Sequence, residues 1–264
     1  MDNYYDFGRY LFDTEDLDPV YSMLTRAGLG ETTLKKFLLA YWCYYSCGTA
    51  AKIVEFANFY EGLKEAFYNK WSRGMERRHF WGTQAWNTIQ ELEEWGDPVR
   101  VVDHMTQHMN SNDIFKAVQS HRGFGPWMGW KIADMSERVL RYEVDFSACT
   151  LMIYKDPVKG AAWIKFGDKE HPITEEELNV VVADMEDDFS NYLAPPHYDR
   201  PVNVQEIETV LCKYKAHCFG FYKLGKDTED IGHGLKGSCD LGDHLLQHLP
   251  GHVPVEIYMG GKYV

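Results

Sequence analysis

The spacing of apolar residues predicts helices along most of the chain. Residues 33–47 (TLKKFLLAYWCYYSC) are apolar on almost every side, which is typical of a buried helix, and Gly48 is expected to end it. Residues 50–67 follow a helical period, and Thr49 is a suitable cap for them. Thr83 is expected to open a third helix.

Later segments carry clear signals for the start of a helix. Ser111 and Pro126 each precede a segment of helical period. Thr174 is followed three residues later by Glu177, which is the pattern of a capping box. Asn203 is expected to cap another helix. The predicted fold class is therefore mostly α.

The Pro-rich segment 193–201 (LAPPHYDRP) is the best candidate for a domain boundary. We expect a larger helical body over residues 1–195 and a C-terminal unit over residues 196–264 that completes the functional site. Within that unit only residues 255–259 (VEIYM) alternate as a strand would.

The composition is that of a globular protein. The chain has 264 residues, of which 45% are hydrophobic, and this is enough to bury a sizeable core. No apolar run is long enough for a membrane span, and the acidic, aromatic start fits neither a signal peptide nor an anchor, so we expect a cytoplasmic protein without a membrane partner. Six cysteines are few for this length, which favours reduced thiols.

The charge distribution leaves room for a polyanionic partner. The net charge of -13 argues against one at first, because nucleic-acid binding rewards clustered Lys and Arg. Residues 165–208 alone hold twelve Asp or Glu against three Lys or Arg, whereas residues 70–79 (KWSRGMERRH) hold four basic residues and one acid. The basic stretch is either a local footprint for an anion or an ordinary solvated helix end.

A Gly-x-Gly bend lies between two segments of helical period at residues 120–125 (SHRGFG). Two helices joined by such a bend form a helix-hairpin-helix, in which glycines permit close approach and helix N–H groups bind a phosphate. The alternative is that the glycines only end a helix. The candidate DNA contacts are Arg122, Gly123, Phe124, Gly125, Trp127 and Lys131.

An aspartate follows the hairpin at the spacing seen in a known class of enzyme. Residues 30–155 resemble helix-hairpin-helix DNA glycosylases, in which a catalytic Asp follows the second helix, and Asp145 stands at the matching position. Asp145 could instead cap a helix that begins near Ser147. The chain departs from the glycosylases because Lys131 is one helical step beyond the position of their lysine nucleophile. Their four-cysteine iron-sulfur pattern is also missing.

A second group of polar residues lies in the C-terminal stretch 208–237. Lys213 and His217 share a helix face at i and i+4, while Lys215 points elsewhere. The loop around Gly225 is able to approach an anion closely, and its neighbours complete the group: Tyr222, Lys226 and Asp227. Zinc binding is disfavoured here because Cys212 and Cys218 lack the usual short ligand spacing, so no metal ligand is assigned.

The hairpin with Asp145, together with ETVLCKYKAH and GFYKLGKD, resembles the α-glutamyl/putrescinyl thymine pyrophosphorylase family of tailed bacteriophages. That resemblance implies a transferase that hypermodifies thymine in DNA. Its substrates would be duplex DNA that carries 5-(pyrophosphooxymethyl)uracil and an amino acid, such as glycine, or another amine.

The resemblance also implies roles for the candidate residues. Asp145 would accept the proton of the amine or orient it. Lys213, His217 and Lys226 would neutralise pyrophosphate, with a divalent metal ion as an open option and no certain cofactor. Arg73, Arg77 or Arg78 would bind DNA phosphates or the amino acid carboxylate. The site residues expected to bind substrate are Lys215, Tyr222, Lys226, Asp227, Arg77 and Arg78.

Two other functions fit the same residues. The chain could be a base-excising glycosylase, or a DNA-binding module that uses the hairpin alone without catalysis.

Overall fold

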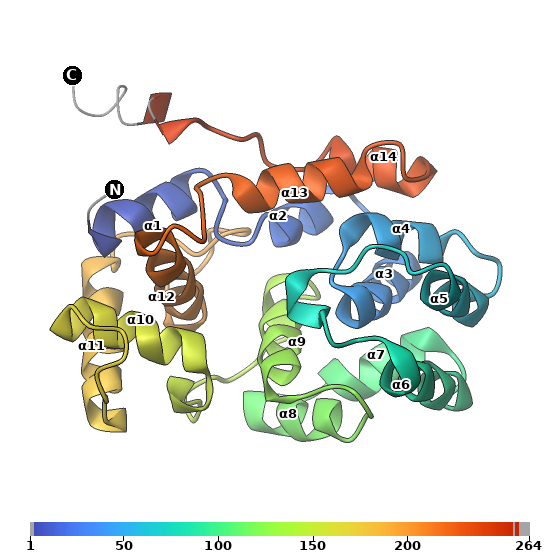
Figure 1. Ribbon diagram of the computed structural model, residues 1–264, viewed down its shortest axis with the longest axis horizontal. Coiled ribbons are helices and arrows are strands. Elements are labelled where there is room, and N and C mark those ends of the chain that lie inside the picture. Colours follow the sequence, from blue (N-terminus) through green and yellow to red (C-terminus); the bar gives the residue numbers. More distant parts are fainter. Residues whose placement is uncertain (1–2, 256, 259–264) are drawn as a thin grey trace. The chain divides into compact units, whose positions relative to one another are not determined.

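The computed structural model describes residues 3–255 and 257–258, and its regular elements are helices joined by loops (Figure 1). The elements are α1 (Tyr4–Asp13), α2 (Pro19–Arg26), α3 (Glu31–Tyr44), α4 (Cys47–Val54), α5 (Phe59–Tyr68), η1 (Met75–Arg77), α6 (Gly82–Glu94), α7 (Pro98–Thr106), α8 (Ser111–Gln119), α9 (Pro126–Arg138), η2 (Leu151–Ile153), α10 (Lys155–Phe166), α11 (Glu175–Asp188), α12 (Val204–Cys218), α13 (Lys226–Leu235) and α14 (Asp240–Leu246). In this described part the only β-type pairings are two isolated bridges. The predicted mostly α fold class is confirmed.

The chain forms two compact units. Unit 1 consists of Met1–Ser22, Cys149–Glu229 and Pro250–Val264, and unit 2 consists of Met23–Ala148 and Asp230–Leu249. The expected border between residues 195 and 196 lies inside unit 1, so a separate C-terminal unit stays a prediction. Each unit is described below by itself.

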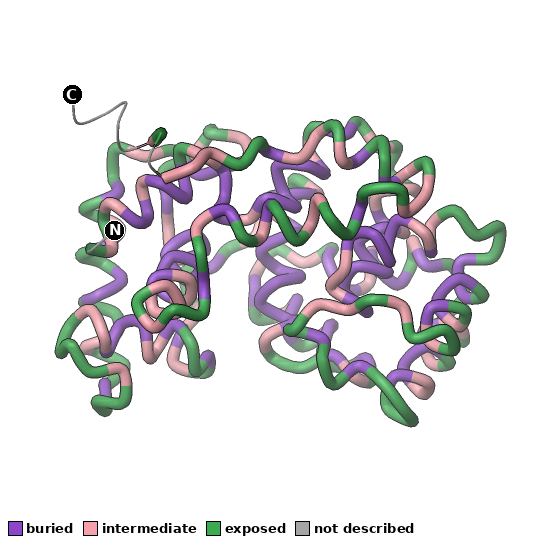
Figure 2. Tube along the Cα trace, turned by 45° about the horizontal axis from the view of Figure 1, so that its top comes forward, coloured by how far each residue is buried: buried purple, intermediate pink, exposed green. Residues whose placement is uncertain are grey.

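Helix α3 is at the centre of the core of unit 2. It packs against α4 and α7, and Phe37, Leu38 and Trp42 are fully buried, as the buried stretch of tube in this segment shows (Figure 2). The prediction of a buried helix here is confirmed. Its expected end at Gly48 was wrong: α3 stops at Tyr44, and its C-cap is Tyr45, which has left-handed backbone angles.

The single helix predicted for residues 50–67 is two helices, which corrects that prediction. Helix α4 starts at Cys47, and its cap is Ser46 and not Thr49. The chain then leaves the helix, and the Asn58 side chain accepts hydrogen bonds from Tyr60 N and Glu61 N to start α5. The break arises because an Asn side chain competes for backbone N–H groups that would otherwise continue a helix.

Unit 1 contains α1, α10, α11 and α12, with aromatic rings at the core. The rings of Phe12 and Phe189 meet edge to face at 5.0 Å. Both predicted caps are confirmed as capping boxes, Thr174 with Glu177 on α11 and Asn203 with Glu206 on α12.

Two local expectations, the cap at Thr83 and the strand over residues 255–259, were wrong, whereas the start of a helix at Ser111 is confirmed. Helix α6 begins at Gly82, with Trp81 as its cap in place of Thr83. The cap of α8 is Asn110, whose side chain accepts from Asp113 N at 2.9 Å, and Ser111 is the first helical residue. Residues 255, 257 and 258 have helical backbone, so the strand expected there is not found in its described part.

The predicted hairpin is formed by α8 and α9 in unit 2. The two helices pack closely because Gly129 faces Phe115: a Cβ at Gly129 would lie 3.1 Å from the Phe115 ring. Ile114, Val118, Met128 and Ile132 are buried between and beside the helices. The loop of residues 120–125 therefore projects from a rigid helix pair.

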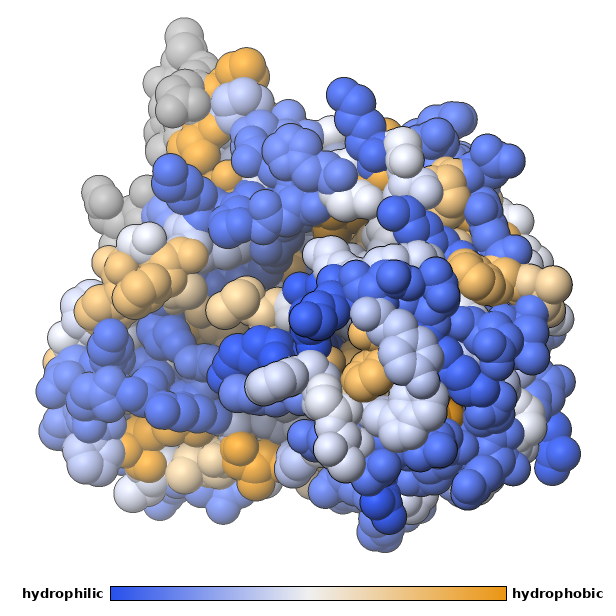
Figure 3. Space-filling view, turned by 45° about the vertical axis from the view of Figure 1, so that its right-hand side comes forward, coloured by the Kyte–Doolittle hydropathy of each residue, from blue (hydrophilic) through white to orange (hydrophobic). Residues whose placement is uncertain are grey.

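One face of the molecule is mainly polar (Figure 3). On the face drawn in Figure 3, hydrophilic residues predominate and hydrophobic residues lie in separate groups. Within residues 3–255 and 257–258, none of the helices has both the length and the apolar character needed to traverse a bilayer.

Gly48→Ala should lower the free energy of unfolding by about 1–3 kcal/mol, because added atoms in a packed interior force the structure to shift. A Cβ at Gly48 would lie 1.9 Å from the Gly234 carbonyl oxygen. Chemical denaturation measures the change. Gly251→Ala is the control, since nothing lies within 4 Å of its added Cβ. Equal stability of the two variants would contradict the close packing of α4 on Gly234.

Candidate functional site

The glycine loop of the hairpin is held by side chains from outside it. Gly123 has a φ of +80°, which favours glycine, and its carbonyl oxygen accepts a hydrogen bond from Arg77 Nη1 at 2.8 Å. The Arg122 backbone N–H donates to Glu91 Oε2 at 3.0 Å. The loop is therefore fixed at both of these peptide groups before any ligand binds.

The start of α9 has no side-chain cap. Its N-cap is Gly125, which is exposed and offers no side chain to the first turn, and Pro126 occupies the first helical position. Trp127 is half-buried and packs edge to face on Tyr45 at 5.2 Å. A helix N-terminus without a side-chain cap suits an anion such as a phosphate.

Arg77 lies beneath this loop and not on the surface. It is 7% exposed, donates from Nε to the Cys43 carbonyl oxygen at 3.0 Å, and packs on the Phe80 and Phe124 rings. Burial lowers the pKa of its guanidinium from the ordinary value. Arg78, in contrast, is exposed and donates to the Met75 carbonyl oxygen at 3.1 Å.

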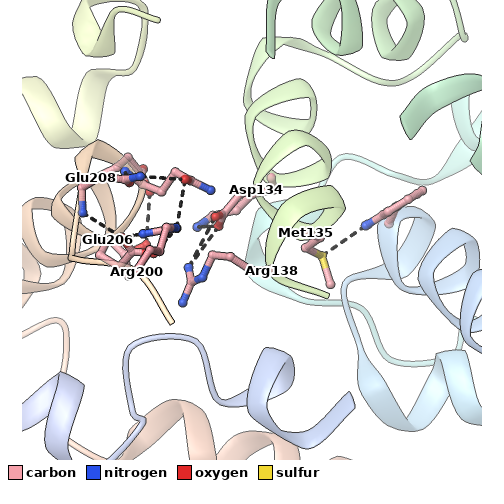
Figure 4. Close-up of polar contacts among 11 residues, drawn as sticks. Asp134, Met135, Arg138, Arg200, Glu206 and Glu208 are labelled. Atoms are coloured by element: carbon pink, nitrogen blue, oxygen red, sulfur yellow. Dashed lines mark hydrogen bonds and ion pairs between the residues drawn. The ribbon is translucent and has the colours of Figure 1, made fainter. Parts of the chain in front are cut away.

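The predicted DNA contacts divide into open and buried positions. Arg122 is exposed, with 64% of its side chain accessible, whereas Phe124 is buried. Lys131 is 7% exposed and its ammonium lies 4.0 Å from Asp134 Oδ2 on the same helix. One turn further along, Arg138 also points to Asp134, at 3.4 Å (Figure 4). Lys131 is thus part of a row of buried charges on α9.

Asp145 is attached by its backbone to the start of α8. Its N–H donates to the Met109 carbonyl oxygen at 2.8 Å, and its own carbonyl oxygen accepts from Ser111 N at 2.9 Å. This parallel bridge places the aspartate beside Asn110, at the end of α8 that is remote from the glycine loop. The side chain itself is exposed.

The Asp145 carboxylate is held in its ionised form. Ser147 donates to it twice, from the backbone N at 2.8 Å and from Oγ at 3.0 Å. The backbone bond first and the hydroxyl bond second keep the pKa of the Asp145 carboxyl below its ordinary value. No helix begins at Ser147, so the carboxylate closes a local turn and the alternative of a helix cap does not apply.

In unit 1 the predicted residues Lys213, Tyr222 and Asp227 come together around a buried aspartate, Asp16. The Asp16 carboxylate accepts from Tyr222 OH and Gly225 N, both at 2.7 Å. Asp16 is 2% exposed. It was missed by the sequence reasoning, because nothing in the residues around position 16 indicates a partner more than 200 positions away.

Lys213 is the cation of this cluster. Its Nζ donates to the Asp16 carbonyl oxygen at 2.6 Å and lies 2.6 Å from Asp227 Oδ2. Burial alone would lower the pKa of Lys213, but the carboxylates around it, Asp227 first, outweigh burial and raise that pKa above its ordinary value. Lys213 is therefore an ammonium ion at neutral pH and cannot act as a base.

The other predicted residues of unit 1 have separate contacts. His217 donates from Nδ1 to the Tyr222 carbonyl oxygen at 3.2 Å. Lys215 pairs with Asp156 on α10. Lys226 is exposed at the first position of α13.

The start of α12, which carries Lys213 and His217, is fixed by a buried ion pair. Arg200 donates to both carboxylate oxygens of Glu206, at 2.9 and 3.0 Å (Figure 4). Glu206 is 0% exposed and also closes the capping box with Asn203. Two-point pairing of this kind defines a direction as well as a distance, so it orients the helix.

The described residues offer no ready metal centre. Among them, no three His, Cys, Asp or Glu side chains gather as ligands, and all six cysteines are free thiols. A divalent ion that arrives with pyrophosphate therefore stays a prediction about the substrate.

Comparison with known proteins places the chain in a family. The family described as amino acid:DNA transferase matches residues 8–221. The chain belongs to the amino acid:DNA transferase family. The matched segment includes the hairpin, Asp145, Asp16 and Lys213, and it ends just before Tyr222.

Two relatives in this amino acid:DNA transferase family come from bacteriophages. The chain is 38% identical over 256 residues to a glycinyltransferase of Pseudomonas phage PaMx11, which covers 86% of this chain and 87% of the relative. It is 26% identical over 257 residues to a putrescinyltransferase of Delftia phage PhiW-14, which covers 93% of this chain and 82% of that relative. The predicted family resemblance and the prediction that the chain is a transferase enzyme are confirmed.

Ser147→Ala should raise the pKa of the Asp145 carboxyl toward its ordinary value, because one of the two hydrogen bonds that favour the ionised form is lost while the backbone bond remains. Observation of the side-chain carboxyl by NMR during a pH titration measures the shift. Ser190→Ala, an exposed serine of unit 1, is the control. An unchanged Asp145 titration would show that the hydroxyl bond is not formed in solution.

Asp16→Asn should lower the free energy of unfolding by about 2–4 kcal/mol. The amide NH₂ group would face N–H and O–H groups that now donate to the carboxylate, and the positive charge of Lys213 would lose a nearby negative charge. Denaturant unfolding measures the loss. Asp187→Asn, an exposed residue at the end of α11, should change stability by less than about 0.5 kcal/mol. Similar stabilities for both variants would overturn the role of Asp16 as the centre of the cluster.

Proposed function

We propose that this protein transfers an amino acid or another amine onto an activated thymine-type base in duplex DNA. Membership of the amino acid:DNA transferase family is the observation that carries the proposal. Glycine is the first candidate amine, because the glycinyltransferase is the more similar of the two phage relatives, and putrescine is the alternative. Such an enzyme would act in the host cytoplasm, on phage DNA.

The substitution takes place at the exocyclic methylene carbon of 5-(pyrophosphooxymethyl)uracil. The amine nitrogen forms a bond to that carbon, the carbon–oxygen bond breaks, and pyrophosphate leaves with the electron pair. The amine gives up one proton. The reaction therefore needs an orienting group for the amine and compensation of negative charge on the leaving group.

The hairpin is suited to hold the DNA backbone. Its loop is fixed by Arg77 and Glu91, and the start of α9 has no side-chain cap, so backbone N–H groups are available to a phosphate. We propose that Arg122, Gly123, Gly125 and Trp127 line this contact. The target nucleotide would be swung out of the stack, since the methylene carbon is hard to reach within a duplex.

Asp145 would orient the attacking amine. Its carboxylate is exposed and its pKa is lowered, so it is ionised at neutral pH and can pair with an amine that carries positive charge as the new bond forms. Because its pKa is lowered, the Asp145 carboxylate is a weak base. Its proposed role is therefore to orient the amine and stabilise its positive charge, and not to keep its proton.

The basic groups of unit 1 would compensate the leaving group. His217 and Lys226 are the proposed contacts to pyrophosphate oxygens. Lys213 would not contact pyrophosphate directly, because its ammonium is already bound by Asp16 and Asp227. It would instead hold these residues in place. Tyr222, Asp227 and Lys215 are proposed to shape this part of the site, and Arg78 to contact a phosphate or the carboxylate of the amino acid.

The purified protein should convert duplex DNA with 5-(pyrophosphooxymethyl)uracil and glycine into a glycine-substituted base with release of pyrophosphate. Digestion to nucleosides and mass analysis measures the product, and putrescine in a parallel reaction tests the second amine. Asp145→Asn should slow product formation by at least about 100-fold with DNA binding retained.

The matched control for this reaction is Asp187→Asn, which alters an exposed carboxylate of unit 1 and should keep full activity. Abasic sites in place of substituted bases would mean excision and would refute transfer. DNA binding without any product would leave only the binding-module function. Wild-type rates for Asp145→Asn would remove that residue from the reaction.

A further inference from the structure

The loop between α5 and α6 presents basic and apolar side chains to solvent. We call residues 73–81 the clamp loop. The wider stretch 70–79 holds four basic residues and one acid in a chain with a net charge of -13. Met75 is 73% exposed and Trp81 is 63% exposed, while Arg78 and His79 are also exposed. Two large apolar side chains and two exposed basic side chains thus share one short loop, and this combination suits a face that binds a polyanion with stacked bases.

Hydrogen bonds hold the backbone of the clamp loop in place, so its exposed side chains project from a fixed backbone. The Gly74 N–H donates to the Tyr44 carbonyl oxygen at 2.9 Å, and Arg73 Nη1 donates to the Phe80 carbonyl oxygen at 2.5 Å. Met75 begins the 3-10 turn η1. Its side chain is therefore held outward at a defined point.

Arg77 joins the clamp loop to the glycine loop of the hairpin. The two loops are neighbours in unit 2 because its guanidinium bonds to the Gly123 carbonyl oxygen at 2.8 Å. A hollow lies where they meet, lined by Glu76, Arg77, His79, Phe80, Gln84 and Gly123. Any strand of DNA that touches the hairpin loop on this side must pass the clamp loop as well.

One atom at this hollow lacks a partner. Arg77 Nη2 is buried and makes no hydrogen bond to any other described group. Buried N–H groups in native proteins are nearly always bonded, so a water or a small anion bound in the hollow would satisfy this one. The charge of Arg77 also offsets the Glu76 carboxylate that shares the hollow, which makes this side of the loop less repulsive to a DNA phosphate.

We propose that the clamp loop is a second DNA contact, in which the exposed Arg78 binds a backbone phosphate and Met75 enters the base stack beside the extruded nucleotide, while the buried Arg77 holds the two loops together. This inference rests on the proposed function. Methionine suits the role because its unbranched, polarisable side chain fills an irregular gap, and apolar side chains that enter a base step hold the duplex open. Met75, at the start of η1, is the most exposed apolar residue of the clamp loop.

The test for Met75 uses a duplex with 2-aminopurine next to 5-(pyrophosphooxymethyl)uracil and no amine. The fluorescence of 2-aminopurine rises when it loses its stacking neighbour. The wild type should give this rise, Met75→Ala should lose most of it with less than about a threefold change in Kd, and Met75→Leu should restore it. Val180→Ala, which truncates an exposed residue of α11, is the control and should match the wild type.

The test for the charged part uses binding to an unmodified duplex at several salt concentrations. Arg78→Gln should weaken binding several-fold at low salt and reduce the slope of log K against log salt by about 1, because one phosphate contact is lost. Arg100→Gln removes an exposed arginine of α7 and should leave the slope unchanged.

The outcomes separate the clamp loop from the reaction itself. If Met75→Ala matches Val180→Ala, or if Arg78→Gln matches Arg100→Gln, that part of the clamp loop is not a DNA contact. Either result overturns the inference and leaves transfer intact if the wild type still makes product. If both variants behave as expected but no amine is transferred, the clamp loop stands and the proposed function fails.

Discussion

Two hydrogen bonds to the backbone of the glycine loop hold the surface on which the proposed function depends. Arg77 bonds to the Gly123 carbonyl oxygen and Glu91 accepts from the Arg122 N–H. A loop that grips a phosphate with its own backbone has no side chain to adjust, so its shape must exist before DNA arrives. An unconstrained loop would lose conformational entropy on binding and weaken the complex. The buried Arg77 guanidinium, which packs on Phe80 and Phe124, thus holds the glycine loop in a fixed conformation before DNA binds.

The hairpin also places the proposed phosphate contact at the glycine loop and the proposed catalytic residue, Asp145, at opposite ends of α8. The parallel bridge at Asn110 holds Asp145 at the start of α8, and the glycine loop follows the end of that helix. With nine residues in α8, the two features are about 13 Å apart along its axis. One nucleotide therefore cannot place its phosphate at the glycine loop and its stacked base at Asp145 at the same time. The nucleotide that reacts must lie further along the strand or leave the stack, which agrees with the proposed extrusion of the base.

The parts of this structure that local sequence patterns encode were predictable, and the parts that distant contacts decide were not. The capping boxes of Thr174 and Asn203 depend on residues three positions apart, and both are confirmed. The break before Asn58 was missed because its apolar period continues across it while the amide side chain restarts the helix. Asp16 was missed for a different reason. Its partner Gly225 is 209 positions away, so only the folded chain reveals that a buried carboxylate orders the segment that contains Tyr222 and Asp227.

The same contacts change which cations are available to DNA and to pyrophosphate. On sequence alone, Lys213, Lys215 and Lys131 all offered positive charge to an anion. In the fold, Lys213 is bound by Asp227, Lys215 by Asp156, and Lys131 lies in the buried charged row with Asp134. An ammonium that already faces a carboxylate gains little from a second anion, since its field is largely cancelled. In unit 2 the attraction for a polyanion is then expected from exposed side chains such as Arg78, in the loop that Arg77 joins to the glycine loop. A chain with a net charge of -13 therefore relies on a small, well-placed positive region, and its affinity for DNA should fall with salt only as far as the few phosphate contacts of that region allow.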